Sequence, residues 1–425
     1  MTLWTDDAGD PHLAVETRVL PCGLTVLLHR DASAPQIAAS IWYRVGSSDE
    51  RPDRTGFAHL FEHLFKQPPE RFGGFHHYDV LKRAGAADAN ASTSADRTAY
   101  HEVVPANQLP LALWLESDRM GYFAAGFTAE RLATQQSVVR QERRQRYEDV
   151  PYGAERLAMG LALYPEGHPL RHLTIGRHDD IQAATPDDVL DFYRTWYVPA
   201  NATLVLAGDL PASLDDLLAR YFGTFPSSSR PPRAQPVAPV PSAPLARVDD
   251  RFAALGRIHR AYLGPRALTD DEAALDLLAQ AWSQPGTGAL WRRLVYDERL
   301  AQKVSAWTVN GRLGGEFHIA VDLQTGTDPA RVRAILDEET ARLPDTQAIA
   351  RAATRTEAAA VWSLTSLGKR ANLLQRYALY GAGAPGDALA AELARYRAAD
   401  LPAAHARYLT APPIEIETVP HTNMT

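Results

Sequence analysis

Alternating apolar and polar residues dominate the start of the chain and predict β-strands. The stretches LAVETRVL, GLTVLLHRD and QIAASIWYRVGSS, between residues 13 and 48, combine this alternation with β-branched side chains. Such a pattern is typical of a sheet with one covered face. Residues 98–104 have the same character. Residues 201–208 are predicted to be a buried strand, and residues 257–264 a further strand.

Apolar residues at helical spacing mark the segments between these strands. The pattern predicts helices over residues 55–65, about 107–120, about 128–148, 185–196 and 271–282. Thr185 followed by Pro186 is a typical helix start. Threonine caps free N–H groups, and proline is tolerated at the first helical position.

A proline-rich stretch divides the chain. Residues 226–244 hold seven prolines and a run of three serines. This composition suits neither a helix nor a central strand and is typical of an extended linker. We therefore predict a first domain over residues 1–225, a linker over 226–246 and a second domain over 247–425.

The sequence after the linker echoes the sequence before it. Residues 397–419 resemble residues 182–208, with Tyr408 matching Tyr193 at an offset of 215. The chain is therefore predicted to be a duplication.

Composition narrows the classes of function. The chain has 425 residues, 45% apolar and 22% charged, and its net charge of −7 offers no basic surface for nucleic acid. A single cysteine, Cys22, excludes an internal disulfide and a cysteine-rich metal site. No apolar run is long enough to predict a membrane span, and no secretory signal is visible. A cytoplasmic location is expected, or a periplasmic or secreted one if a signal was trimmed.

One predicted helix carries a set of metal-binding side chains. In TGFAHLFEHLF, residues 55–65, His59 and His63 are four residues apart and share a helix face, and Glu62 lies beside them. Two imidazoles at this spacing suit Zn²⁺, and a neighbouring carboxylate can take a proton from zinc-bound water. The alternative is a helix whose histidines only pack or face water. In the second copy, these positions are Leu275, Leu278 and Ala279, so no second metal site is expected.

A third ligand is sought on the helix of residues 128–148. Leu132, Val138 and Val139 are expected to mark its buried face, where Glu142 also falls. A buried carboxylate must be paired or bound to metal. Glu142 is therefore preferred over Glu102, Glu116 and Glu148. The alternative is a salt bridge to an arginine of a neighbouring helix.

Small residues precede the strand of residues 98–104. Around Asn90, Ala91, Ser92 and Thr93, small side chains allow another backbone to approach, as in an edge strand that accepts a peptide. The alternative is a loop that leads into an ordinary strand.

Together these stretches resemble the M16 family of zinc peptidases, the pitrilysin and mitochondrial-processing-peptidase group, in its half-length form. The matching segments are HLFEH (59–63), NASTSADRTAYHEVVP (90–105), LWLESDRM (113–120), VVRQERRQRYEDVPYG (138–153) and YVPANATLVLAGD (197–209). The resemblance implies an α+β fold of two homologous α/β-sandwich domains, which form half of a clamshell around a chamber for peptides and unfolded segments.

The resemblance also implies roles for single residues. His59, His63 and Glu142 are expected to bind one zinc ion per chain, with Glu62 as the general base. Residues 90–93 are expected to hold the substrate backbone.

Two positions depart from the family pattern. Seven residues before the third ligand, the family often has a glutamate where this chain has Gln135, a neighbour of the zinc ligands without the charge. In the second domain, the family has an arginine and a tyrosine seven residues apart, where this chain has Val295 and Gln302. Both groups that polarise the substrate are therefore missing.

Two functions follow from this pattern. The preferred one is the zinc-bearing subunit of a metalloendopeptidase that works as a heterodimer with a homologous subunit carrying the arginine and tyrosine. The alternative is a non-catalytic, M16-like structural subunit of a larger complex. An intact set of His59, Glu62, His63 and Glu142 favours the peptidase, because a scaffold has no physical reason to keep a buried polar cluster.

Overall fold

The computed structural model describes residues 11–66, 76–235, 245–381 and 383–421. Its contacts divide the chain into two compact units. The first unit is Met1–Gln141, Leu173–Ala234 and Val361–Ala390, and the second is Glu142–His172, Gln235–Ala360 and Ala391–Thr425. Each unit therefore contains segments from both halves of the sequence. The predicted linear domain boundaries stay a prediction, and residues 236–244 of the predicted linker lie outside the described residues.

The first unit is built on a six-stranded mixed sheet. Its strand order is β1-β2-β6-β3-β5-β4, and all pairings are antiparallel except that of β2 with β6. The strands are β1 (Glu16–Val19), β2 (Thr25–Arg30), β3 (Gln36–Tyr43), β4 (Asn90–Thr93), β5 (Thr98–Pro105) and β6 (Ala202–Gly208). Strand β6 is buried along its whole length, as its apolar run predicted.

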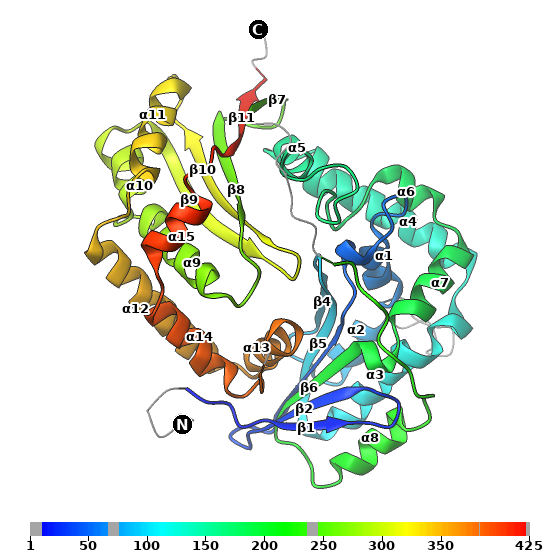
Figure 1. Ribbon diagram of the computed structural model, residues 1–425. Helices are drawn as coiled ribbons and strands as arrows, with labels where there is room; N and C mark the ends of the chain where they lie inside the picture. Colours follow the sequence, from blue (N-terminus) through cyan, green and yellow to red (C-terminus); the bar gives the residue numbers. More distant parts are fainter. Residues whose placement is uncertain (1–10, 67–75, 236–244, 382, 422–425) are drawn as a thin grey trace. The chain divides into compact units, whose positions relative to one another are not determined.

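Helices cover both faces of this sheet (Figure 1). On one face Leu374 of α13 packs with Leu27, Ala38 and Val205, although α13 comes from the far end of the sequence. On the other face lie α1 and α3. The helices of this unit are α1 (Phe57–Leu64), α2 (His77–Arg83), α3 (Leu109–Tyr122), α4 (Ala129–Arg143), α6 (His178–Ala183), α7 (Pro186–Trp196), α8 (Leu214–Phe222) and α13 (Leu367–Tyr380).

The second unit repeats the topology of the first. Its five-stranded sheet has the order β7-β11-β8-β10-β9, with β7 and β11 parallel and the other neighbours antiparallel. The strands are β7 (Leu245–Asp250), β8 (Arg257–Gly264), β9 (Ala301–Asn310), β10 (Gly315–Leu323) and β11 (Ile414–Pro420). The same pairings join β2, β6, β3, β5 and β4 in the first unit. The predicted α+β duplication is therefore confirmed.

In the second unit, α9 takes the place of α1 and is an ordinary core helix. Leu275, Leu278 and Ala279 are buried there, in the main core of this unit. Helix α5 belongs to this unit too, and its Met159 and Leu163 pack with Ala261 and Ile416 of the sheet. The helices are α5 (Gly153–Leu163), α9 (Asp270–Ser283), α10 (Ala289–Trp291), α11 (Pro329–Thr340), α12 (Thr346–Ser363), α14 (Ala388–Arg397) and α15 (Leu401–Tyr408).

No described helix has the length and apolar character that crossing a membrane requires.

Candidate metal centre

Helix α1 begins at a glycine that no other residue could easily replace. Gly56 has a φ of 89°, in the left-handed region, and a Cβ there would lie 2.7 Å from the carbonyl oxygen of Ile175. Beside it, the Glu50 carboxylate accepts hydrogen bonds from the backbone N–H groups of Gly56 and Ala58, at 2.7 and 2.8 Å. These two bonds satisfy donors that the start of a helix leaves open.

The apolar side of α1 is held by aromatic rings. Phe61 stacks on Tyr197 with ring centroids 4.7 Å apart, and Phe65 lies 4.8 Å from the same tyrosine. Tyr100 of β5 donates a hydrogen bond from its hydroxyl to the Phe61 carbonyl oxygen, at 3.3 Å. Because these rings are buried, α1 has one well-defined rotation about its axis, and its polar face is fixed with it.

That polar face brings the predicted motif together. One ligand atom each of His59, Glu62 and His63 lies within 4.8 Å of the others, and the two imidazole centroids are 4.7 Å apart. His59 and Glu62 are buried, whereas His63 is partly exposed. Two imidazole nitrogens and a carboxylate at this spacing form a donor set that suits Zn²⁺.

Two neighbours fix the Glu62 carboxylate. Lys66 donates from Nζ to Oε1, and Thr93 donates from its hydroxyl to Oε2, each at 2.7 Å. Burial raises the pKa of Glu62, but Lys66, His59 and Thr93 lower it by more, so the net pKa is below the usual value for glutamate. Glu62 is therefore held as a carboxylate in one orientation.

Thr93 belongs to an edge strand. Within the described chain, β4 pairs with β5 alone, through Asn90 to Thr93, and its other side carries no strand. Asn90 is exposed and Ala91 is buried, while Ser92 and Thr93 are partly exposed. The segment is thus a strand rather than a loop, and it lies beside the metal-binding helix. Its role in holding a substrate backbone stays a prediction.

Helix α4 carries the predicted third ligand. Its buried residues are Leu132, Gln135, Gln136 and Val139, spaced for one face of a helix. Glu142 continues this stripe, and its side chain is 15% exposed. The expectation that Val138 marks the buried face is wrong, because Val138 is 43% exposed. It lies about 100° around the helix from Val139.

Glu142 is not part of the cluster of donor atoms on α1. It forms an ion pair with Arg146, four residues further along the chain, at 2.9 Å. Gln135 lies seven residues earlier on the same stripe and is buried. The assignments of Glu142 as third ligand and of Gln135 as its neighbour stay predictions.

The other three candidates for the third ligand, Glu102, Glu116 and Glu148, are carboxyl groups that interact with other residues. Glu148 pairs with Arg143. Glu116 accepts two 2.7 Å bonds from Arg119, and both side chains are almost completely buried. Burial and the charge of Glu116 raise the pKa of Glu102 well above the usual value for glutamate, which favours the protonated form of Glu102. None of the three joins the donor cluster on α1.

Glu102, Glu116 and Arg119 form a buried polar cluster that the sequence pattern did not reveal. The guanidinium of Arg119 lies 3.9 Å from the ring centroid of Tyr100, whose hydroxyl bonds the Phe61 carbonyl. The cluster therefore supports α1 through Tyr100, which contacts both Arg119 and the backbone of α1. The spacing of Glu116 and Arg119 on α3 hinted at an ion pair, but only the sheet places Glu102 beside them.

Replacing Glu102 with glutamine is expected to stabilise the fold at neutral pH. The folded pKa of Glu102 is raised by burial, so the unfolded chain gives up this proton at a lower pH than the folded chain. The stability of the parent therefore falls, relative to Glu102→Gln, as pH rises above the usual glutamate pKa of 4.5. Thermal unfolding at pH 5 and pH 8 measures this.

The expected result is a gain in Tm for Glu102→Gln that is larger at pH 8 than at pH 5. Glu130→Gln is the control, because Glu130 is exposed and should change Tm little at either pH. A gain that is independent of pH would contradict the assignment of Glu102 as a buried neutral acid.

In the second unit, Val295 and Gln302 lie in two different elements. Val295 packs against the core from a π-helical turn, Arg292–Asp297. Gln302 is exposed on β9 and bonds Gln324 at 3.4 Å. Neither can supply a cation or an acidic hydroxyl.

Comparison with known families covers most of the chain. Residues 25–159 match the family described as insulinase (peptidase family M16), and residues 183–349 match the one described as the peptidase M16 inactive domain. The first match contains His59, Glu62, His63 and Glu142.

Several zinc proteases are similar in sequence. PqqE of Helicobacter pylori is 28% identical over 276 residues, 63% of this chain and 60% of that protein. The probable zinc protease PqqL of Escherichia coli is 24% identical over 332 residues, 73% of this chain and 33% of that protein. The chain thus spans less than two thirds of the length of each.

Solved structures share the fold over nearly the whole chain. A protease from Helicobacter pylori has a TM-score of 0.86 at 22% identity, and covers 96% of this chain and 100% of its own. The periplasmic protease PqqL from Escherichia coli has a TM-score of 0.75 at 17% identity, over 99% of this chain and 48% of that one. This chain therefore corresponds in fold to half of the longer protease.

Proposed function

We propose that this chain, which belongs to the M16 family of zinc peptidases, is the zinc-bearing subunit of an endopeptidase that cleaves peptides or unfolded segments. The observation that carries the proposal is the donor cluster of His59, Glu62 and His63 on α1, whose ligand atoms lie within 4.8 Å of one another. Two of these three side chains are buried, and apolar residues fill the same positions in the second copy of the fold, so a polar set has little structural use here.

We assign one zinc ion per chain to His59, His63 and Glu142. The donor set fits zinc, since neutral imidazole and carboxylate are among its preferred ligands, and catalytic zinc sites commonly use three of them. Bound there, zinc supplies Lewis-acid polarisation and makes a water molecule more acidic. Gln135, seven residues before Glu142, is proposed to hold that carboxylate through a polar contact.

The remaining steps use residues of this chain. Glu62 takes the proton of the attacking water and later delivers it to the leaving amine. Thr93 and Lys66 keep its carboxylate oriented. The free edge of β4 is proposed to pair with the substrate backbone from Asn90 to Thr93, which would bring an extended peptide past Glu62.

A second subunit is proposed to complete the site. Val295 and Gln302 leave this chain without the arginine and tyrosine of its family, so a homologous partner that carries them is expected. We also propose a cytoplasmic location for the protein, as the sequence predicted. The structurally similar PqqL is described as periplasmic. Cell fractionation of the native protein distinguishes the two compartments.

The zinc assignment is tested by replacing His63 with alanine. We expect the purified parent to contain one zinc per chain and His63→Ala to lose most of it, because two protein ligands hold zinc far less tightly than three. Elemental analysis of both proteins is the measurement, with His421→Ala as the control, since His421 is exposed and belongs to the second unit. Full zinc content in His63→Ala would refute the site. A folded parent that takes up no zinc would favour the non-catalytic structural subunit instead.

A further inference from the structure

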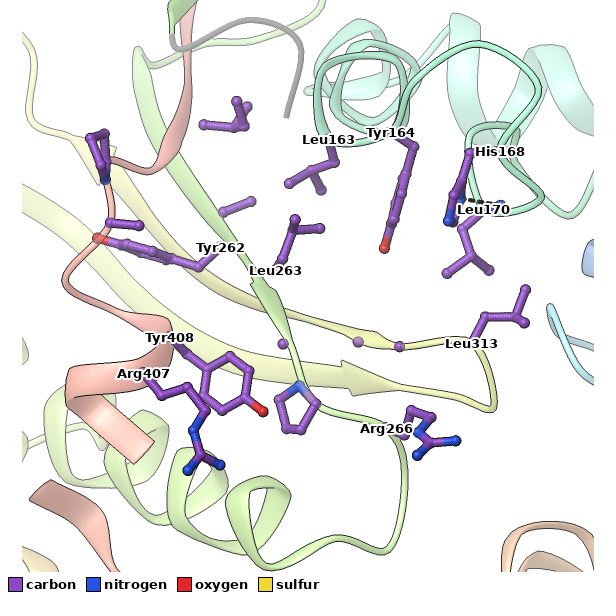
Figure 2. A pocket seen from close by; sticks show the side chains of 18 residues that line it. Leu163, Tyr164, His168, Leu170, Tyr262, Leu263, Arg266, Leu313, Arg407 and Tyr408 are labelled. Carbon is purple, nitrogen blue, oxygen red and sulfur yellow. Dashed lines mark hydrogen bonds between the residues drawn. The ribbon is translucent and has the colours of Figure 1, made fainter. Parts of the chain in front are cut away.

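The second unit contains a pocket that the zinc chemistry does not use. It has a volume of about 490 Å³ and is lined by 18 residues, all of them in the second unit (Figure 2). They come from the end of α5 and the loop after it, from the adjoining ends of β8 and β10, and from the segment between α15 and β11. This volume lies within the range of small-ligand sites.

The walls of this pocket are mostly apolar. Leu163, Leu170, Leu263 and Leu313 line it, together with the rings of Tyr262 and Tyr408 (Figure 2). The pocket has open space beside Gly314, where an added Cβ would meet only one atom within 4 Å, a carbonyl oxygen at 3.9 Å. An apolar side chain could therefore be buried here.

Arg266 is an exposed arginine among the residues that line the pocket. Among the described residues, none forms an ion pair or a hydrogen bond with its guanidinium. Arg407, the other arginine of the lining, is already paired with Asp271. An anionic group on a ligand would therefore find its complement in Arg266.

Tyr164 offers the pocket a hydrogen-bond acceptor. Its hydroxyl faces the cavity in Figure 2, but its only proton is donated to Glu316 Oε1, at 2.8 Å. Only lone pairs remain for a ligand. Burial and the charge of Glu316 raise the pKa of Tyr164, which keeps the hydroxyl protonated.

A buried chain of hydrogen bonds holds the carboxylate of Glu316, which accepts the Tyr164 proton, in place. Its second oxygen lies 2.8 Å from His318 Nε2, His318 Nδ1 lies 3.1 Å from His259 Nε2, and His259 Nδ1 lies 2.5 Å from Glu155. Burial raises the pKa of Glu316, but the bonds from His318 and Tyr164 lower it by more, so its net pKa is below the usual value for glutamate. Glu316 therefore acts as the acceptor of the Tyr164 proton.

We propose that this pocket binds a peptide residue with a large apolar side chain next to a carboxylate, in the manner of a peptide carboxyl terminus. The carboxylate pairs with Arg266, the amide N–H of the residue donates to the Tyr164 oxygen, and the side chain lies among the leucines. The choice of a peptide rests on the proposed peptidase function, whereas the complementarity in charge and shape rests on the pocket itself.

The test is the binding of three fluorescein-labelled hexapeptides to the full-length Glu62→Gln chain, which should not cleave them. One ends in phenylalanine with a free carboxylate, the second is its carboxyl-terminal amide, and the third ends in Phe-Asp-amide. We expect the free acid or the Phe-Asp peptide to bind at least about tenfold more tightly than the amide, because a hydrogen bond to a charged group contributes this much. Which of the two binds identifies the source of the carboxylate.

Arg266→Met should remove this preference and leave the weak binding of the amide unchanged. Arg247→Met is the matched control, since Arg247 is exposed on β7 and does not line the pocket. Leu170→Trp, which fills the cavity, should abolish binding of all three peptides. Equal binding of all three to the parent, or a preference that survives Arg266→Met, would overturn the proposal. Zinc-free protein should bind the peptides equally well, so a failure of the pocket is distinguishable from a failure of the peptidase.

Discussion

Glu62→Gln is expected to leave the chain folded and loaded with zinc while lowering peptide hydrolysis by about a hundredfold or more. Glutamine keeps the shape of the side chain and can still bond Thr93, but it cannot accept the proton of the attacking water. Zinc binding should survive, because the proposed ligands are His59, His63 and Glu142. The loss should therefore fall on turnover and not on metal content.

The measurement combines elemental analysis with hydrolysis of an unfolded polypeptide, with the partner subunit present. Glu130→Gln is the matched control, since it makes the same chemical change at an exposed site on α4. Lys66→Met separates orientation from basicity: it removes one bond to Glu62 and should reduce turnover less than Glu62→Gln does. Near-parental cleavage by Glu62→Gln would show that another group activates the water.

The isolated chain is expected to be at least about a hundredfold less active than the chain mixed with its partner. Peptide hydrolysis places negative charge on the carbonyl oxygen, and the loss of one donor aimed at that charge typically costs about this factor. Val295 packs in the core and Gln302 bonds Gln324, so this chain offers no replacement. Zinc supplies part of the polarisation, which leaves a slow residual activity.

The partner is expected to be a homologous chain that has an arginine and a tyrosine seven residues apart and lacks the metal-binding motif. Activity should appear on mixing and should be lost again when the arginine of the partner is replaced by methionine. The double variant Val295→Arg and Gln302→Tyr is the complementary experiment, and partial activity of this variant without the partner would support the same mechanism. Full activity from a verified monomer or homodimer of the unmodified chain would refute the heterodimer.

Features of the fold that depend on short stretches of sequence were predicted correctly. His59, Glu62 and His63 share a helix face because one turn of helix fixes their spacing, and no distant residue is needed to predict it. Alternation likewise located β2, β3 and β5, and the repeat near Tyr193 and Tyr408 anticipated that both sheets have the same strand order. The expected boundaries of β8 matched the structure, since strand-forming residues end there at Gly264 and Pro265.

Burial on a polar helix was harder to predict. The buried stripe on α4 passes through Leu132, Gln135, Gln136 and Val139, and leaves the adjacent Val138 43% exposed. Hydrophobicity alone could not choose between the two valines, because half of that stripe is polar. The choice depends on which side of α4 the rest of the protein covers.

The sequence by itself thus determined the metal-binding face of α1, most strands and the duplication. The first two depend on the spacing of residues a few positions apart, and the third depends on a repeat in the sequence. Only the tertiary structure decided that Thr93 bonds Glu62, that Glu102 joins Glu116 and Arg119, and that α13 covers the first sheet while α5 covers the second. It also assembled the pocket at Arg266 from segments more than 200 residues apart. Such contacts depend on strand register and on which faces pack together, and those are settled by the burial of the whole chain and not by local spacing.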